Sequence, residues 1–403
     1  MKLFYNSHAQ LLRATLLILL VTAFSQCKKD VMETADSIQN QKVALSAKQL
    51  KKNMLLSVQG ITNKSFYLEE ALPEGYVTDG SKDYTSIIQS VLNKYDDIVF
   101  PAFTLQVNDK GLQITSNKSI VFLEGSQIRL KPTNLDTYNI IDIEGAKNVT
   151  LYNPVVIGDR YKHLGEGGEA GVGIGIRGSS DITLINPNVR ECWGDGIYIG
   201  QVNNRGFSKD ITITNAYLKR NRRDGISIIS VNGLRLDSPY AGYSDGTSPM
   251  CGINFEANNT YCEMKDILIT DPLTVKNEGN GIQMGFKRML GDGNKEIDIT
   301  IINHKDVDSR VRSFKAACNS NTNDNMSGTI NVINPKWHLP KLGYPLYFST
   351  NQPDISLNID SPEVIDEEGI SLSDDVYMNL FDNGIGGSGK LKIKKKKKNN
   401  NDN

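Results

Sequence analysis

Two aspartates have the residue type and the spacing for acid–base chemistry. Asp195 and Asp224 each stand directly before a Gly-Ile pair, and Glu256 lies in the next segment that opens with Gly-Ile. If these segments are strands that stack about 4.8 Å apart, their carboxylates approach the separations of glycosidic-bond-cleaving pairs. Those separations are about 5 Å for retention and about 6.5–9.5 Å for inversion. We therefore predict Asp195, Asp224 and Glu256 as catalytic residues.

Polar side chains surround these acids in the sequence. Strand alternation turns Tyr198, Ser227, Asn254, Glu256 and Gln283 to one outer face, where they line a groove, and Arg222 and Arg223 precede Asp224 at the corner. We predict Tyr198, Asn254, Arg222 and Arg223 as substrate-binding residues. Two simpler interpretations stay open, because Asp-Gly is also an ordinary turn dipeptide and Glu256 beside arginines could form an ion pair on a solvated face.

A Gly-rich insertion after Ile157 carries further candidates. It contains Arg160 and His163, and Arg177 ends the strand that follows it. We predict His163 as a catalytic acid or base, since its unperturbed pKa is near neutral, with an inert surface role as the alternative. A buried core role is not expected in such a charged loop. Arg160 and Arg177 are predicted to bind substrate, Arg177 through a bidentate contact to a sugar carboxylate.

These residues need a repeated framework, and the sequence contains one. Alternating strands end in Asn or Asp at positions 153, 186, 215, 271, 303 and 334. The interval from 215 to 271 is about twice as long as the others, and residues 233–239 within it show the same alternation. Gly-Ile strands are interleaved between them. Short strands that repeat about every 30 residues predict an all-β protein, a parallel β-solenoid, whose inward Ile, Val and Leu stack coil on coil. Asn at one corner of successive coils would form a hydrogen-bonded ladder.

The start of the repeat resembles a known family. Asp79-Gly80, a helix carrying Ile87-Ile88-Gln89, and Val99-Phe100-Pro101 look like the N-terminal cap of pectin-lyase-like right-handed β-helices. The resemblance extends from Thr78 to about Ile359. It implies a right-handed parallel β-helix with an N-terminal capping helix, and it says less about the reaction.

Within that superfamily, the polygalacturonases are similar only in part. Gly194-Asp195-Gly196-Ile197 resembles their Asp-Asp-Cys-Ile motif with Gly194 in place of the first Asp, and Asp224 stands where they have His. Val172 stands where that family has another Asp, so only Asp195 keeps a matching acid and their mechanism does not transfer whole.

Three functions follow as expectations, each with a polysaccharide or oligosaccharide as partner. The first is a glycoside hydrolase with paired carboxylates. The second, implied by β-helix lyases, is β-elimination on a uronate glycan, with Arg222 or Arg223 as base and Ca²⁺ held by Asp195, Asp224 and Glu256. The third is a non-catalytic glycan-binding surface protein. No cofactor is predicted with certainty, and Ca²⁺ belongs to the lyase alternative alone.

The termini indicate the compartment. Residues 1–26 have the layout of a lipoprotein signal, with Cys27 as the acylated residue. Residues 27–70 are predicted as a tether, 71–390 as the β-helix, and 391–403 as a disordered Lys/Asn-rich tail. We expect an exported protein, anchored by lipid at the outer membrane, the cell surface or in the periplasm, with an ordinary cleaved signal as the alternative.

Charge and cysteine usage exclude other classes. The formal net charge is −1, and the lysine run near the end masks an acidic body, which argues against nucleic-acid binding. The cysteines after Cys27 show no Cys-x-x-Cys spacing, so packing is expected, with pairing open if Cys192 and Cys251 stack adjacently.

Overall fold

The computed structural model describes residues 59–203, 205–319, 323–387 and 390–395. The chain forms two compact units, Met1–Asn63 and Lys64–Asn403, and the fold below concerns the second. The predicted signal, Cys27 and most of the predicted tether lie outside the described residues. In the part of the chain described, no helix is long and apolar enough to cross a membrane.

The second unit is a right-handed parallel β-helix, the solenoid that the repeat predicts with the handedness that the family resemblance implies. Every pair of neighbouring named strands runs parallel, and the strands assemble into three long sheets, here named A, B and C. Sheet A follows the order β1 (Phe66–Tyr67), β3 (Asp97–Phe100), β6 (Lys118–Phe122), β9 (Lys147–Tyr152), β12 (Ser180–Ile185), β15 (Ser208–Thr214), β18 (Val231–Asp237), β21 (Met264–Thr270), β24 (Lys295–Ile302), β27 (Met326–Ile333), β30 (Asp354–Asp360) and β33 (Lys390–Lys394).

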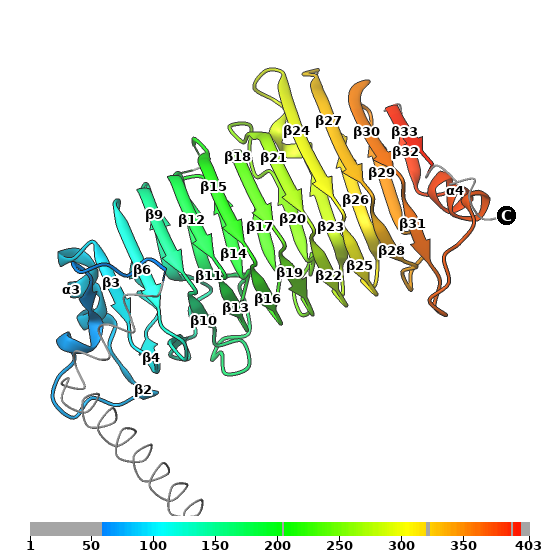
Figure 1. The fold of residues 1–403 in the computed structure, drawn as a ribbon. Coiled ribbons are helices and arrows are strands. Elements are labelled where there is room, and N and C mark those ends of the chain that lie inside the picture. The colour runs from blue at the N-terminus through cyan, green and yellow to red at the C-terminus, as the bar shows by residue number, and fades with distance from the viewer. Residues whose placement is uncertain (1–58, 204, 320–322, 388–389, 396–403) are drawn as a thin grey trace, which may run out of the picture. The chain divides into compact units, whose positions relative to one another are not determined.

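Sheets B and C complete each coil. Sheet B consists of β2 (Asp79–Asp83), β4 (Thr104–Val107), β7 (Gln127–Leu130), β10 (Val155–Ile157), β13 (Asn188–Arg190), β16 (Tyr217–Lys219), β19 (Tyr240–Gly242), β22 (Leu273–Val275), β25 (Lys305–Val307), β28 (Lys336–His338) and β31 (Glu363–Ile365). Sheet C consists of β5 (Leu112–Gln113), β8 (Thr137–Glu144), β11 (Ala170–Arg177), β14 (Ile197–Gly200), β17 (Ile226–Ile228), β20 (Ile253–Glu256), β23 (Asn280–Gly285), β26 (Arg312–Cys318), β29 (Leu346–Thr350) and β32 (Ile385–Gly387). The coils stack side by side in chain order (Figure 1).

The Gly-Ile repeat has a steric cause. Ile197, Ile226 and Ile253 align across β14, β17 and β20 and are fully buried, and each such side chain contributes roughly 1.5–3 kcal/mol to stability. At the preceding glycine the next coil approaches closely, since a Cβ on Gly225 would lie 2.5 Å from the carbonyl oxygen of Gly252. No larger residue fits there.

The predicted Asn ladder is confirmed. Asn153, Asn186 and Asn215 adopt φ angles of 53°, 51° and 53°, in the left-handed region that Asn tolerates better than most residues. Asn186 donates to Asn153 at 2.8 Å, and Asn215 donates to Asn186 at 3.0 Å. Ser238, with φ 51°, turns the corner after residues 231–237, so the double interval does contain two coils.

Helices lie at both ends of the unit (Figure 1). The predicted N-terminal helix is α3 (Thr85–Lys94), which buries Ile88, Val91 and Leu92. At the other end α4 (Asp374–Asp382) packs the ring of Phe381 edge-on to that of Trp337, 6.0 Å between centroids. Two short 3₁₀ helices, η1 (Leu68–Ala71) and η2 (Lys287–Met289), complete the described helices.

Pairing extends past both predicted boundaries of the β-helix. β1, expected in the tether, pairs with β3, and β33, expected in the tail from residue 391, pairs with β30. Leu391 and Ile393 alternate within β33 and pack against the core, which explains why this lysine-rich segment continues the sheet. Cys192 and Cys251 are buried and form no disulfide, and the other two described cysteines, Cys262 and Cys318, are also free.

One polar network lies inside the stack. Trp337 donates to Nδ1 of His304 at 3.0 Å, so Nε2 carries the proton that faces Thr274 at 2.9 Å. Thr274 and Ser309 each donate to one oxygen of Asp306 at 2.6 Å. Burial lowers the pKa of His304 to about 3 and raises the pKa of Asp306 to about 6.

Candidate functional site

The predicted groove row is present on the outer face of sheet C. Tyr198, Ser227, Asn254 and Gln283 are register partners on consecutive strands, β14, β17, β20 and β23. The alternation read from the sequence therefore assigns the correct face to each of them.

A single guanidinium joins the predicted catalytic carboxylates. Arg223 Nη1 donates to both oxygens of Asp195, at 3.2 and 3.1 Å, and to Asp224 Oδ2 at 3.1 Å. Its Nη2 donates to Glu256 Oε2. Three coils thus each supply one acid to one cation, and Glu169 from the preceding loop adds a fourth, 3.7 Å from Nε.

Asp224 is the most enclosed member of this Arg223 cluster. Its Oδ1 accepts from the backbone N–H of Cys251 at 2.7 Å, and its Oδ2 accepts from Ser227 and Asn254 at 3.1 and 3.0 Å in addition to Arg223. Asn254 also donates to Glu256 Oε2 at 3.1 Å. With every oxygen engaged and no accessible surface, Asp224 holds its neighbours in place rather than facing a ligand.

Exposure separates the carboxylates into two groups. Asp195 and Asp224 are buried, whereas the side chain of Glu256 is 35% exposed and that of Glu169 is 62% exposed. Ser227 and Asn254 face outward as expected but are also fully buried. Their burial corrects the expectation that they line an open groove: Arg223 contacts Ser227, and Asp224, Glu256 and Gln283 hydrogen-bond to Asn254.

Burial shapes the electrostatics of the cluster. Desolvation raises the pKa of Asp195, although Arg223 opposes the change. Desolvation also raises the pKa of Asp224, and the neighbouring charge of Asp195 adds to the effect. Burial alone would lower the pKa of Arg223, but Asp195, Asp224 and Glu256 outweigh it and the pKa rises. The guanidinium is therefore held firmly in its charged form.

Arg177 and Tyr198 form a second contact on the same face. The guanidinium of Arg177 lies 4.4 Å from the centre of the Tyr198 ring, within the range of a cation–π interaction. Arg177 also donates to Asn139 at 2.9 Å and lies 3.6 Å from Asp142. The two predicted binding residues meet on adjacent coils beside the Arg223 cluster.

His163 does not lie on the surface, and that part of the expectation is wrong. Its side chain is buried, its Nδ1 is 2.8 Å from Asp159 Oδ2, and its ring stacks on Trp193 with 3.9 Å between centroids. Asp159 also accepts from the Tyr138 hydroxyl at 2.6 Å. The Gly-rich loop folds back on the coil and encloses the imidazole, whose Nε2 has no partner in the part of the chain described.

Arg222 and Arg160 hold this loop. Arg222 lies 3.9 Å from the centre of the Trp193 ring and donates to the Gly168 carbonyl at 2.7 Å. Arg160 donates to the carbonyl of Arg220 at 2.8 Å and pairs with Asp245. Neither side chain forms a hydrogen bond or an ion pair with Asp195, Asp224 or Glu256 among the described residues, so the predicted site divides into two neighbouring groups.

Two neighbours were not anticipated from the sequence. Trp193 contacts both His163 and Arg222, and its position directly before Gly194-Asp195 could have indicated that it lies near the site. Glu169 approaches Arg223 from a loop without periodicity, so nothing in the pattern indicated its direction. Among the described residues, no group of three or more His, Cys, Asp and Glu side chains could hold a metal ion.

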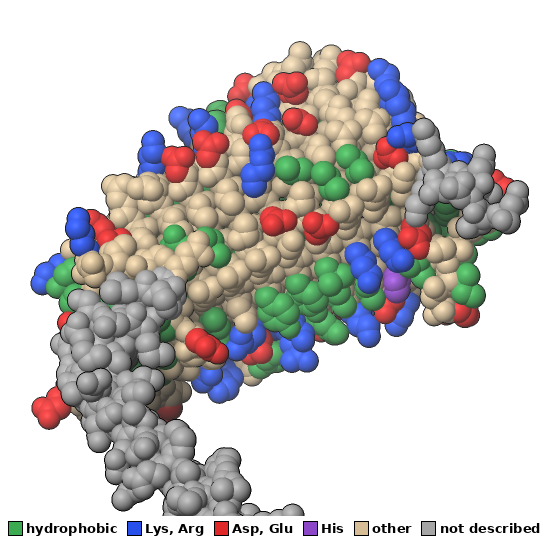
Figure 2. Space-filling model, viewed as in Figure 1, with side chains coloured by type: hydrophobic (Ala, Val, Ile, Leu, Met, Phe, Trp, Pro, Cys, Tyr) green, Lys and Arg blue, Asp and Glu red, His purple; other side chains and the backbone are tan. Residues whose placement is uncertain are grey.

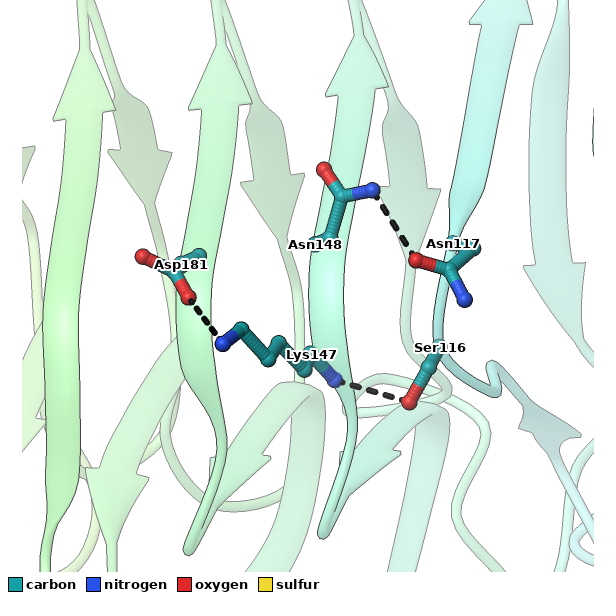
Figure 3. Close-up of a pocket in the computed structure, with 5 residues that line it drawn as sticks. All are labelled: Ser116, Asn117, Lys147, Asn148 and Asp181. Carbon is teal, nitrogen blue, oxygen red and sulfur yellow. Dashed lines mark hydrogen bonds and ion pairs between the residues drawn. The ribbon is translucent and has the colours of Figure 1, made fainter.

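A shallow hollow on sheet A offers little chemistry. Figure 3 shows Lys147 directed toward Asp181, 3.6 Å away, and Asn148 donating to Asn117 at 3.0 Å. The Lys147 backbone N–H donates to Ser116 at 2.9 Å. These five exposed or half-buried residues satisfy one another at the starts of β6, β9 and β12, at the opposite end of these strands from the Asn ladder, which indicates a structural role.

Proteins with similar sequences do not indicate an activity for this chain. No family model matches the chain. The SPbeta prophage-derived uncharacterized protein YorA of Bacillus subtilis is 30% identical over 163 residues, 36% of this chain and 28% of that protein. The uncharacterized protein YclG of the same organism is 24% identical over 245 residues, 53% of this chain and 41% of that protein. The chain thus matches well under two thirds of either relative.

Solved structures extend the likeness. The Streptococcus pneumoniae adhesin PfbA has a TM-score of 0.48 at 12% identity, covering 82% of this chain and 100% of that one. The Yersinia enterocolitica family 28 exopolygalacturonase also has 0.48 at 12%, covering 84% and 79%. The tailspike gp49 of Acinetobacter baumannii bacteriophage Fri1, a capsular polysaccharide depolymerase, has 0.46 at 12%, covering 82% and 63%. These likenesses concern the fold alone.

Proposed function

We propose that the outer face of sheet C binds a polysaccharide and hydrolyses its glycosidic bonds at the Arg223 cluster. The observation that supports this most is the sharing of one guanidinium by Asp195, Asp224 and Glu256, from three consecutive coils. Paired carboxylates are the usual means of glycoside hydrolysis, and Glu256 is open to solvent beside them.

The three acids take different roles in this proposal. Glu256 faces the sugar as nucleophile or base, and Arg223 fixes its direction. Asp195 retains 3% exposure where Asp224 has none, and its pKa is raised by burial, so Asp195 supplies the proton to the leaving oxygen. Asp224, predicted from the sequence as catalytic, becomes a positioning residue because it has no exposed surface and its oxygens accept from Arg223, Ser227, Asn254 and the Cys251 N–H.

Side chains on both sides of the cluster supply binding groups. Arg177 and Tyr198 lie toward the N-terminal coils. Toward the C-terminal coils, Gln283 accepts from Lys315 at 3.2 Å. A ring face, an amide and two cations on one face suit hydroxyl-rich chains, including acidic ones.

One observation favours a lyase as the second candidate. Burial and the neighbouring Arg160 lower the pKa of Arg222, although Glu169 opposes the effect, and a lowered pKa suits an arginine that removes a proton. Arg223 fits that role poorly because its carboxylates stabilise the charged form. The Ca²⁺ predicted for this alternative would need ligands that now surround Arg223.

The test is incubation of the purified protein with plant and algal polysaccharides, following reducing ends and the ultraviolet absorbance of unsaturated uronates. The proposal expects reducing ends without absorbance. Absorbance would support the lyase, and retention on one glycan without any product would support a binding protein instead.

We also propose export and acylation at Cys27, on the layout of the first 27 residues. Labelling with radioactive palmitate in the expressing bacterium should mark the wild type and not Cys27→Ala. Equal labelling of both would contradict acylation at this residue.

A further inference from the structure

A hollow of about 720 Å³ lies away from the Arg223 cluster, along β2, β4, β7, β10 and β13 of sheet B. Residues from these strands and from the loop after β10 line it. They are Asp79, Gly80, Ser81, Gln106, Arg129, Leu130, Pro132, Ile157, Gly158, Asp159, Tyr161, Lys162, Arg190 and Glu191. The volume is in the range of small-molecule sites, about 300–1,000 Å³.

Two arginines lie in one row of this hollow. Arg129 pairs in register with Ile157, and Ile157 pairs with Arg190. The arginines are therefore two coils apart, about 10 Å between their backbones, with an apolar residue between them. Lys219 continues the row on the next coil.

The donors of both arginines are largely unused. Arg129 has no hydrogen-bond or ion-pair partner in the described part of the chain, and Arg190 donates only to Asn188, at 3.0 Å. Both side chains are half-buried. A guanidinium carries five N–H donors, so most donors of these two arginines are available to a ligand.

The rest of the lining is apolar or aromatic. Ile157 and Leu130 are buried and form a floor, and the ring of Tyr161, 63% exposed, stands beside it. Lys162 adds an exposed cation. A ligand with C–H faces and acidic groups would use both kinds of surface.

The acidic groups limit what else could bind. Asp79 and Glu191 line the hollow, while Asp159 is already committed to Tyr138, His163 and Thr133. Carboxylates beside the arginines would repel the continuous phosphate backbone of a nucleic acid, and the chain carries a net charge of −1. Separate acidic groups on a sugar chain avoid this conflict.

We propose that this hollow is a second carbohydrate site, which binds a sugar carrying carboxylate or sulfate groups through Arg129 and Arg190. It lies on the outer face of sheet B, a different face from the Arg223 cluster on sheet C. Lys and Arg side chains also gather along the lower edge of the unit in Figure 2, and hydrophobic side chains lie over β16, β19 and β22 beside them. Tyr217 and Tyr240 stack there, 4.8 Å apart, so a longer chain would continue along this face.

The test compares binding of the full chain to polygalacturonate, dextran sulfate and neutral dextran by affinity electrophoresis. Arg129→Gln combined with Arg190→Gln should weaken binding to the two anionic polymers about tenfold or more and leave the polysaccharide-cleavage assay unchanged. Arg235→Gln is the matched control, since Arg235 pairs with Asp266 on sheet A. Circular dichroism checks that each variant is folded.

Four results would overturn the proposal. The double variant could bind the anionic polymers as tightly as wild type, the wild type could bind neutral dextran equally well, or a single-stranded oligonucleotide could bind as tightly as polygalacturonate. Inorganic sulfate could also displace dextran sulfate when both supply the same concentration of sulfate groups. The hollow would then be an anion site without carbohydrate selectivity, which would also contradict the proposal.

Discussion

Replacing Arg223 by methionine should expose how much the cluster depends on one cation. Methionine keeps much of the aliphatic volume and removes the charge. Asp195 and Asp224 would then be buried without a cation, since Arg223 is the only one within 4.0 Å of either among the described residues. Breaking a buried ion pair from one side costs about 3–5 kcal/mol, because the remaining charge loses its compensation.

That free energy corresponds to a modest change in melting temperature. The entropy of unfolding is about 2.1 cal/mol/K per residue, which gives about 0.7 kcal/mol/K for the unit Lys64–Asn403. The Arg223→Met variant should therefore melt about 4–7 °C below wild type near pH 8. Arg235→Met is the control, because its exposed pair with Asp266 is worth about 0–1 kcal/mol.

The loss should depend on pH with a definite sign. The pKa values of Asp195 and Asp224 are raised in the folded protein, so their protonated forms favour folding at low pH and that stability is lost as the pH rises through the folded values. Without Arg223 both values rise further. The difference between variant and wild type should be smallest near pH 4 and largest near pH 8.

Thermal melts followed by circular dichroism at pH 4, 6 and 8 measure both quantities. A variant that melts with wild type at every pH, or one destabilised equally at pH 4 and pH 8, would refute the description of the cluster as two buried carboxylates held by Arg223.

Two further substitutions test the solenoid itself. Asn186→Ala removes two ladder hydrogen bonds and places at φ 51° an alanine, whose side chain cannot form a local hydrogen bond. We expect the free energy of unfolding to fall by about 2–3 kcal/mol and the melting temperature by about 3–4 °C. An unchanged melting temperature would contradict the contribution of the ladder to stability. Asp306→Asn removes a buried carboxyl with a pKa of about 6. Because this pKa lies above the unfolded value, the wild type loses about 2 kcal/mol of stability between pH 4 and pH 8 that the variant does not lose. Equal pH dependence of the two melting temperatures would show that Asp306 does not carry this charge.

The sequence predicted the fold because the repeat leaves few alternatives. Asn or Asp at 153, 186, 215, 271, 303 and 334 all adopt positive φ, and Gly-Ile pairs mark where neighbouring coils approach most closely. Both signals are local and recur. The ends were less certain: Phe66–Tyr67 and Lys390–Lys394 pair only at the last coils, where the composition reads as linker or tail.

The sequence predicted which face of the sheet the site residues occupy, but not which of them contact one another. Alternation gave the outward row of Tyr198 and Asn254, but it did not indicate that Arg223 contacts Ser227 and three acids at once. His163 shows the same limit, because its burial against Trp193 depends on how a Gly-rich loop closes. Side-chain direction in such loops is set by tertiary contacts that no periodicity records.

The most direct measurement of the proposed function is the cleavage rate of Glu256→Gln on whichever polysaccharide the wild type degrades. Glutamine keeps the size of the side chain and its hydrogen bonding, but it cannot act as base or nucleophile. Glu278→Gln is the control, since Glu278 pairs with Arg310 on the surface. We predict a fall of about 10²–10⁴-fold in rate for Glu256→Gln, with its circular dichroism spectrum and the activity of the control unchanged. A Glu256→Gln protein that cleaves at the wild-type rate would contradict the assignment of the Arg223 cluster as the active site.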